Sequence, residues 1–122
     1  MLFFKSAEKP VQTVAPAPPR APRYTSVARV RINGFEGEAI LRNISSSGFR
    51  MESRTYASIT VGEKYSMEIQ PEANAGVKAF GLDVEVRWVQ STETNFSSGF
   101  FIIRPPIDKS LEKYINYIKT RN

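Results

Sequence analysis

The sequence predicts an all-β protein, namely a six-stranded antiparallel barrel followed by one helix and preceded by a flexible arm rich in proline and alanine. Short runs of alternating apolar and polar residues recur at the spacing of hairpin-connected strands. The pair Asn33-Gly34, typical of a hairpin turn, stands between two such runs. Beyond two consecutive prolines, apolar residues recur at helical spacing. We therefore expect the arm over residues 1–22, the barrel over 23–106 and the helix over 107–122.

Composition favours a binding protein over an enzyme. The 122 residues suffice for one domain with a single core. Cysteine and histidine are absent, which excludes disulfides, thiolate or imidazole metal ligands and the usual near-neutral general base. We expect no catalytic residues, no metal and no cofactor. A chain without cysteine suits a reducing compartment, so we expect a cytoplasmic protein. We also expect a monomer.

The net charge of +5 is concentrated near the N-terminus. Residues 1–23 carry four basic side chains and one acidic side chain, so they account for +3 and the remaining chain for only +2. This distribution predicts a local anionic partner rather than a whole face for nucleic acid, and we expect no DNA binding.

The arm begins with Met1-Leu2-Phe3-Phe4, an apolar run that is too short for a secretory signal or a transmembrane segment. We expect this run to pack on the domain or on a partner, with weak membrane contact as the alternative. From Pro10 to Pro22 the chain has five prolines, which predict an extended, partly polyproline-II segment. Two arginines, Arg20 and Arg23, stand at its end.

The first hairpin is expected to have a two-residue turn at Asn33-Gly34, so that paired residue numbers sum to 67. This register places Arg31 opposite Glu36 and Arg29 opposite Glu38. Cross-strand pairs of opposite charge contribute about 0.2–1 kcal/mol each. We therefore assign these two arginines a structural role rather than a ligand-binding one.

Extended toward the N-terminus, the register brings the arm to a polar turn, Asn43–Gly48. It places Tyr24 across from Asn43, Arg23 across from Ile44, and Arg20 near Ser47. Strand pairing must end around Pro22, because proline has no N–H to donate. We expect the arm to deliver its two arginines to the turn.

Four further strands are predicted from alternation, at residues 49–52, 64–70, 82–88 and 99–103. In the third of these, Trp88 shares a face with Val84 and Val86, so its default position is in the core or at the barrel end.

Pro105-Pro106 ends the predicted sheet. Asp108 or Ser110 can cap a helix after it, in which one apolar stripe is formed by Leu111, Tyr114, Ile115 and Ile118. A helix of this length is marginal by itself, so we expect it to pack on the barrel.

The turn and the arm together offer two guanidinium groups, an amide, three hydroxyls and a glycine. Arginine presents paired planar donors that suit phosphates and purine edges, and it also stacks on bases. Asparagine offers a donor beside an acceptor, while serine hydroxyls and backbone amides suit phosphate oxygens. This set predicts a site for a small nucleotide-like anion rather than a reaction centre.

The pattern Asn43-x-Ser45-x-x-Gly48, preceded by arginines 20 residues earlier, resembles the PilZ domain family over about residues 20–120. The resemblance implies a six-stranded barrel that binds the bacterial second messenger cyclic di-GMP through R-x-x-x-R and D/N-x-S-x-x-G motifs. It implies that Arg20 and Arg23 clamp guanine and phosphate, Asn43 reads a guanine edge, Ser45 sits near phosphate or base, and Gly48 leaves room for the ligand. Further candidates are Ser47, Tyr24 and Trp88, the last as a stacking partner for guanine.

Three functional hypotheses follow. The first is a non-enzymatic receptor or adaptor that orders its arm on binding cyclic di-GMP and signals to a protein partner. The arginines here are three residues apart, with Pro19 four residues before Arg23. This spacing motivates the second, a PilZ-like interaction module in motility or pilus assembly that has lost nucleotide binding. The third is a single-stranded nucleic-acid binder, whose affinity would fall steeply with salt.

Overall fold

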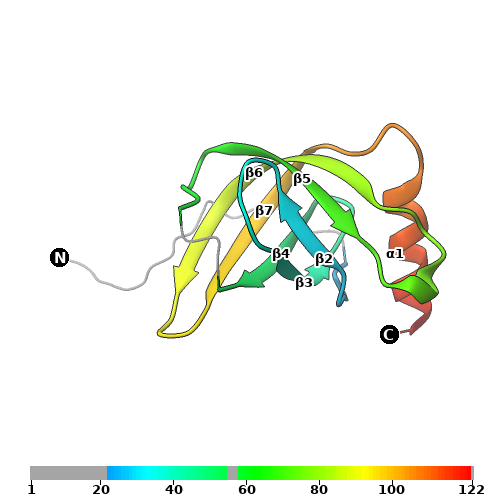
Figure 1. Ribbon diagram of the computed structural model, residues 1–122. Helices are drawn as coiled ribbons and strands as arrows, with labels where there is room; N and C mark the ends of the chain where they lie inside the picture. Colours follow the sequence, from blue (N-terminus) through cyan, green and yellow to red (C-terminus); the bar gives the residue numbers. More distant parts are fainter. Residues whose placement is uncertain (1–21, 55–57, 122) are drawn as a thin grey trace.

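The computed structural model describes residues 22–54 and 58–121 (Figure 1). Nearly all of the predicted arm, including Arg20, lies outside these residues. The strands are β1 (Tyr24–Thr25), β2 (Arg29–Ile32), β3 (Ala39–Ile44), β4 (Gly48–Ser53), β5 (Lys64–Gln70), β6 (Phe80–Ser91) and β7 (Phe96–Arg104). The helices are the short 3₁₀ helix η1 (Ala73–Ala75) and α1 (Ser110–Arg121).

Six of the strands close into the predicted antiparallel barrel. The hydrogen-bonded order is β3-β2-β5-β6-β7-β4, and β4 pairs back with β3 to complete the ring. The strand β1 is an addition of two residues that pairs with the end of β3. Alternation explains the strands: in β2, Val30 and Ile32 are buried while Arg29 and Arg31 are exposed. The predicted fold class is confirmed for the barrel and the helix.

The register of the first hairpin differs from the prediction. Arg29 pairs with Ile40 and Val30 with Ala39, so paired numbers sum to 69 rather than 67. The connection is a loop over residues 33–38 that contains two glycines with positive φ, Gly34 at 89° and Gly37 at 91°. The second glycine lets the chain turn once more before it pairs with β2.

With this longer loop, only one of the two predicted arginine–glutamate pairs of β2 forms. Arg29 meets Glu38 as predicted, in an ion pair of 3.6 Å. The pairing of Arg31 with Glu36 is wrong, because Glu36 lies in the loop and Arg31 pairs in register with Glu68 of β5.

The first predicted strand is interrupted, and this shifts the register near the motif. Tyr24 pairs with Ile44 and Thr25 with Asn43, one residue away from the predicted partners. Residues 26–28 separate β1 from β2. A shift of one residue turns side chains to the other face of the sheet. Thr25 therefore shares the outer face with Asn43, while Tyr24 is half-buried and packs against the core.

A bulge in β6 moves Trp88 out of the core. Val86 pairs with Phe100, but Trp88 pairs with Gly99, so Arg87 is an extra residue without a counterpart on β7. Val86 and Phe100 are buried, and the next pair points outward. The prediction that Trp88 shares a face with Val86 is wrong for this reason.

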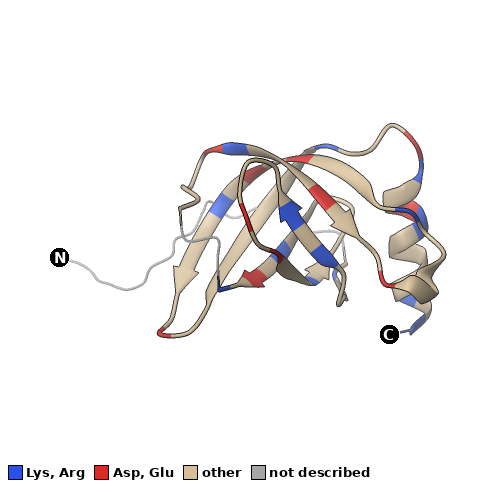
Figure 2. Cartoon of the chain, in the orientation of Figure 1, with Lys and Arg blue, Asp and Glu red and all other residues tan. Residues whose placement is uncertain are grey.

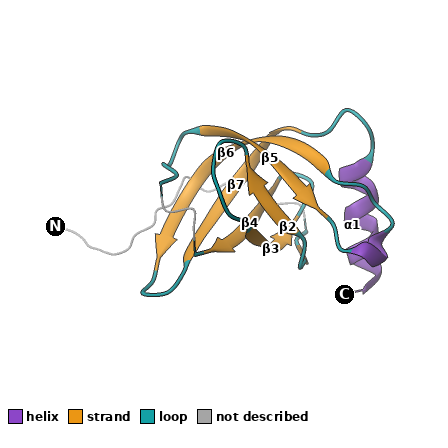
Figure 3. Ribbon diagram, in the orientation of Figure 1, coloured by secondary structure: helices purple, strands orange, loops and turns teal. Residues whose placement is uncertain are grey.

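The helix α1 lies against β1 and η1 at one end of the barrel (Figures 1 and 3). It begins at Ser110, whose N–H donates to Oδ1 of Asp108 at 3.0 Å, a side-chain cap. Three members of the predicted stripe are buried, namely Leu111, Tyr114 and Ile118, and Ile115 is half-buried. In the part of the chain that the structure describes, no helix is long and apolar enough to cross a membrane.

Candidate functional site

The motif turn holds itself together through Ser45. The N–H of Ser45 donates to the carbonyl of Gly48 at 2.8 Å, which closes a tight turn between β3 and β4. The hydroxyl of Ser45 accepts from the N–H groups of Ser47 and Gly48, both at 3.2 Å, and donates to the Gly48 carbonyl at 3.2 Å. Ser45 is 1% exposed. Its side chain therefore fixes the turn from inside, while Ser47 beside it is exposed.

Gly48 is required by the approach of β7. A Cβ at position 48 would overlap the backbone carbonyl oxygen of Phe100. A backbone atom inside a closed barrel cannot move aside cheaply. Gly48 has no positive φ, so the requirement is for space rather than for conformation. The same Cβ position lies 3.7 Å from Nη2 of Arg23, which places that guanidinium beside the turn.

The structure brings Arg23 and Asn43 into direct contact. Nη1 of Arg23 donates to Oδ1 of Asn43 at 2.9 Å, across 20 residues of sequence. Arg23 is exposed and Asn43 is half-buried on the outer face. Three of the predicted site residues, Arg23, Asn43 and Gly48, thus lie together. Arg20 lies outside the described residues.

A row of outward-facing positions connects this cluster with Trp88. Pairing in register runs from Thr25 to Asn43, then to Arg50, Gly99 and Trp88, across β1, β3, β4, β7 and β6. The indole of Trp88 occupies the space above Gly99 and is half-buried. Its ring therefore lies on the outer face of the barrel, one strand away from Arg50.

Arg50 is a member of this row that the sequence reasoning missed. Its Nη1 donates to Oε2 of Glu52 at 3.0 Å, and Oε1 of Glu52 accepts from Nε of Arg42 at 3.0 Å. The hydrogen bond from Arg42, assisted by the charge of Arg50, holds the pKa of the Glu52 carboxyl below its ordinary value. Arginine alternating with apolar residues along β4 was the available signal, but its position beside the motif depends on a bulge in β3 between Leu41 and Asn43.

A solved structure has the same barrel. The structure of the Bacillus subtilis inhibitor of motility (MotI/DgrA) matches this chain with a TM-score of 0.70 and 15% sequence identity. The two share one fold. The match covers 86% of this chain and 52% of the other, so this chain spans about half the length of that protein. No protein-family model matches the sequence, and no curated protein matches it.

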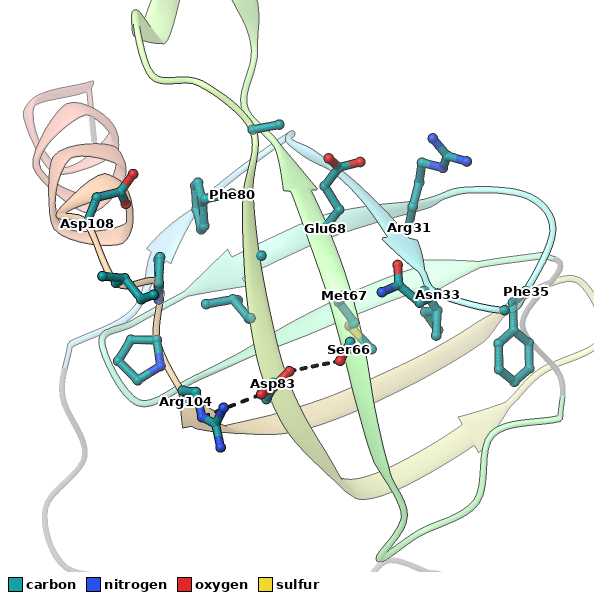
Figure 4. Close-up of a pocket in the computed structure, with 18 residues that line it drawn as sticks. Arg31, Asn33, Phe35, Ser66, Met67, Glu68, Phe80, Asp83, Arg104 and Asp108 are labelled. Carbon is teal, nitrogen blue, oxygen red and sulfur yellow. Dashed lines mark hydrogen bonds and ion pairs between the residues drawn. The ribbon is translucent and has the colours of Figure 1, made fainter.

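A hollow lies elsewhere on the barrel (Figure 4). Its volume is about 1080 Å³, and it shares no residue with the Arg23–Asn43 cluster. Much of its polar lining is already paired: Ser66 donates to Asp83 at 2.9 Å, and Asp83 meets Arg104 at 3.6 Å. In Figure 2, segments coloured for basic residues and segments coloured for acidic residues are interspersed along the ribbon of the barrel rather than separated by sign.

The described residues hold no group of three or more acidic side chains placed to bind a metal ion. The cluster likewise contains no carboxylate next to a hydroxyl or amine that it could activate; the carboxylate of Glu52, which Arg50 contacts, is held by two arginines. What the cluster offers chemically is hydrogen-bond donors from a guanidinium and an amide on a solvent-facing surface.

Proposed function

We propose that this chain is a non-enzymatic, PilZ-like receptor that binds cyclic di-GMP on the outer face of the barrel and passes the signal to a protein partner. The observation that carries the proposal is the 2.9 Å contact between Arg23 and Asn43. These residues stand for the two motifs of the family pattern, and they are 20 residues apart in sequence. Their meeting beside the turn supports a common ligand for both.

The chemistry of each group suits one part of a cyclic dinucleotide. The guanidinium of Arg23 can pair with a phosphate or with the N7/O6 edge of guanine. The amide of Asn43 offers a donor and an acceptor to a base edge. Ser45 acts through the turn, because its hydroxyl already makes three hydrogen bonds there. The exposed hydroxyls of the turn, which a ligand can reach, are those of Ser46 and Ser47.

Trp88 adds a flat surface to this site. Because the bulge in β6 turns Trp88 outward, its indole lies on the same face of the barrel as Asn43. A guanine base that stacks on an aromatic ring gains about 1–3 kcal/mol. The outward position supports the stacking role that the resemblance suggests over a role in the core. Tyr24, which packs against the core, is a weaker candidate for ligand contact.

The arm supplies the second arginine in this proposal. Fixing each arm residue costs about 1–2 kcal/mol of backbone entropy, so Arg20 must gain charge-assisted contacts from the ligand to hold the arm in place. Ordering of the arm would then create the surface that a protein partner recognises.

Isothermal titration calorimetry with cyclic di-GMP tests this function. We expect binding by the wild type and at least about tenfold weaker binding by Arg23→Ala and Asn43→Ala, since a hydrogen bond to a charged group contributes about 1.5–3 kcal/mol. Arg31→Ala is the matched control, because Arg31 is also an exposed arginine and lies on β2, away from the turn. If the wild type gives no heat of binding with cyclic di-GMP, the proposal is wrong.

The R-x-x-R spacing favours a second candidate, an interaction module without nucleotide binding. Its fold likeness to an inhibitor of motility makes a motility component a reasonable partner class. This candidate predicts that a protein partner is captured equally well with or without cyclic di-GMP, and equally well by Asn43→Ala. The receptor predicts a difference in both comparisons.

A further inference from the structure

A buried chain of hydrogen bonds joins the helix α1 to the break between β1 and β2. The hydroxyl of Tyr114 lies 2.6 Å from Oγ of Ser26 and donates to Oε1 of Glu72 at 2.7 Å. Tyr114 is 0% exposed and Ser26 is 1% exposed. These two buried hydroxyls come from positions 88 residues apart, and neither belongs to the motif residues.

The direction of this chain is fixed by the number of protons. A phenol has one proton, and the Tyr114 hydroxyl gives it to the carboxylate of Glu72, the stronger acceptor. The hydroxyl of Ser26 must therefore donate to Tyr114. The lone pairs of Ser26 remain available for the N–H of Ala28, which donates to Oγ at 3.1 Å. Each buried group in the chain is satisfied, and each depends on its neighbour.

At the other end of this series of hydrogen bonds, Glu72 is held by the last residue of α1. Oε2 of Glu72 accepts from Nη1 of Arg121 at 2.6 Å, and the same guanidinium lies over the ring of Tyr117 at 5.3 Å. Glu72 directly precedes η1. The carboxylate of Glu72 thus joins two residues of α1, Tyr114 and Arg121, to the connection between β5 and β6.

The Ser26 end of this series of hydrogen bonds lies close to the candidate site. Ser26 follows Arg23 by three residues, with only the two-residue strand β1 between them. A strand this short has few hydrogen bonds of its own to hold it. The N–H of Ser26 donates to the carbonyl of Arg42 at 3.0 Å, which secures this segment to β3 next to Asn43. The hydrogen bond between the side chains of Ser26 and Tyr114 therefore helps to fix the position of β1 and of Arg23, which directly precedes β1.

We propose that Tyr114 is a positioning residue for the Arg23–Asn43 site, and that docking of α1 and binding of the nucleotide at this site reinforce each other. The inference rests on the proposed function for the identity of the ligand. Tyr114 touches no ligand in this arrangement; it acts by holding Ser26 and, through β1, the segment that carries Arg23. Thermodynamic coupling is reciprocal, so a ligand that fixes Arg23 must also stabilise α1 on the barrel.

The test compares two hydroxyl deletions on the same helix in the full-length chain. Tyr114→Phe removes the link and keeps the buried ring, and we expect about fivefold to tenfold weaker binding of cyclic di-GMP by calorimetry, the low end of measured couplings. Tyr117→Phe is the control, since that hydroxyl is on the same helix and contacts Arg121 rather than Ser26. Ser26→Ala cuts the same link from the other side and should reproduce the effect of Tyr114→Phe.

Amide hydrogen exchange gives a readout that needs no ligand. Tyr114→Phe should speed exchange at Ser26 and Ala28, whose N–H groups donate to Arg42 and Ser26, while Tyr117→Phe should not. In the wild type, added cyclic di-GMP should slow exchange in α1.

The failure of this inference can be told from failure of the proposed function. Normal affinity in both Tyr114→Phe and Ser26→Ala, together with unchanged exchange in Tyr114→Phe, would overturn the coupling while the receptor stands; exchange at Ala28 in Ser26→Ala is not used, because that variant removes the acceptor of the Ala28 N–H. A wild type that does not bind cyclic di-GMP overturns the receptor. The positioning role is then decided by exchange alone: faster exchange at Ser26 and Ala28 supports it, and unchanged exchange rejects it.

Discussion

The indole of Trp88 lies over the α-carbon of Gly99 on the neighbouring strand, in the space that any side chain at position 99 would occupy. Two features produce this relationship. The bulge at Arg87 turns Trp88 outward, and the glycine opposite it leaves the outer face of β7 without a side chain at position 99. The aromatic surface of the candidate site therefore depends on the absence of a side chain from another strand.

Replacing Gly99 by alanine should displace the Trp88 ring. The new Cβ would overlap the indole, and overpacking of this kind destabilises by about 1–3 kcal/mol. The chain has one tryptophan, so its fluorescence reports the ring directly. We expect a shifted emission maximum and a lower midpoint of denaturant unfolding.

Gly81→Ala is the matched control for that prediction. At position 81, on β6, a Cβ would lie 3.7 Å from the carbonyl oxygen of Met67, an ordinary van der Waals distance. We expect unchanged emission and a stability equal to the wild type or slightly higher, because alanine has less backbone entropy to lose. Equal behaviour of the two variants would contradict the packing of Trp88 on Gly99.

Gly48→Ala should destabilise the barrel itself. The atom that a Cβ would meet is the carbonyl oxygen of Phe100, in the β4–β7 pairing next to the motif turn. Relief requires that two strands separate, so we expect a loss of about 1–3 kcal/mol or more in the free energy of unfolding. Urea denaturation measures it, again against Gly81→Ala. A fully stable Gly48→Ala protein would contradict this steric requirement.

Local patterns in the sequence were sufficient for most of the barrel. Alternation identified the six strands, and the spacing of Leu111, Tyr114 and Ile118 identified the buried stripe of the helix. The contact between the arm and the turn was also within reach, because Arg23 lies close to a strand that pairs with the strand carrying Asn43. Extension of one hairpin register was enough for that approach, although the register itself was off by one or two residues.

Bulges and contacts between residues far apart in the sequence could not be predicted from local patterns. A bulge adds one residue to one strand, and nothing in the local alternation around Arg87 indicates it. The outward position of Trp88 and the approach of Phe100 to Gly48 both depend on pairing between distant strands. The link from Ser26 to Tyr114 spans 88 residues and involves a serine in an interruption that the strand pattern conceals.

The hydrogen bond between Arg23 and Asn43 should contribute little to folding. It lies on the surface, and a typical hydrogen bond contributes about 0.5–1.5 kcal/mol net. We expect a double-mutant cycle with Arg23→Ala and Asn43→Ala to give a coupling at or below this range by urea denaturation. Both variants should remain folded, since domains are stable by about 5–15 kcal/mol. A coupling of several kcal/mol would mean that loss of ligand binding in these variants reflects unfolding.

Acid should loosen α1 through Glu72. Burial by itself would raise the pKa of this carboxyl, but hydrogen bonds from its own N–H, from Tyr114 and from Arg121 outweigh burial, so the pKa lies below its ordinary value of 4.5. A group with a lowered pKa in the folded state contributes stability that is present above its unfolded pKa. That contribution is lost as the pH falls through the lower, folded pKa. The acidic window therefore starts near pH 4.5 and extends below it.

The measurement is amide exchange in α1 as a function of pH, corrected for intrinsic exchange, in the wild type and in Glu72→Gln. We expect protection of α1 in the wild type to fall as the pH drops below about 4.5, while the variant starts with less protection and changes less. Glu52 and Asp108 also have lowered pKa values, through hydrogen bonds with Arg42 and Ser110. Both residues are present in the wild type and in Glu72→Gln, so their effect on the acid response is the same in each. Glu112→Gln, at an exposed position in the first turn of the same helix, is the control and should follow the wild type. If Glu72→Gln retained the full acid response, the hydrogen bonds that link Ser26, Tyr114, Glu72 and Arg121 would not be what holds α1 at neutral pH.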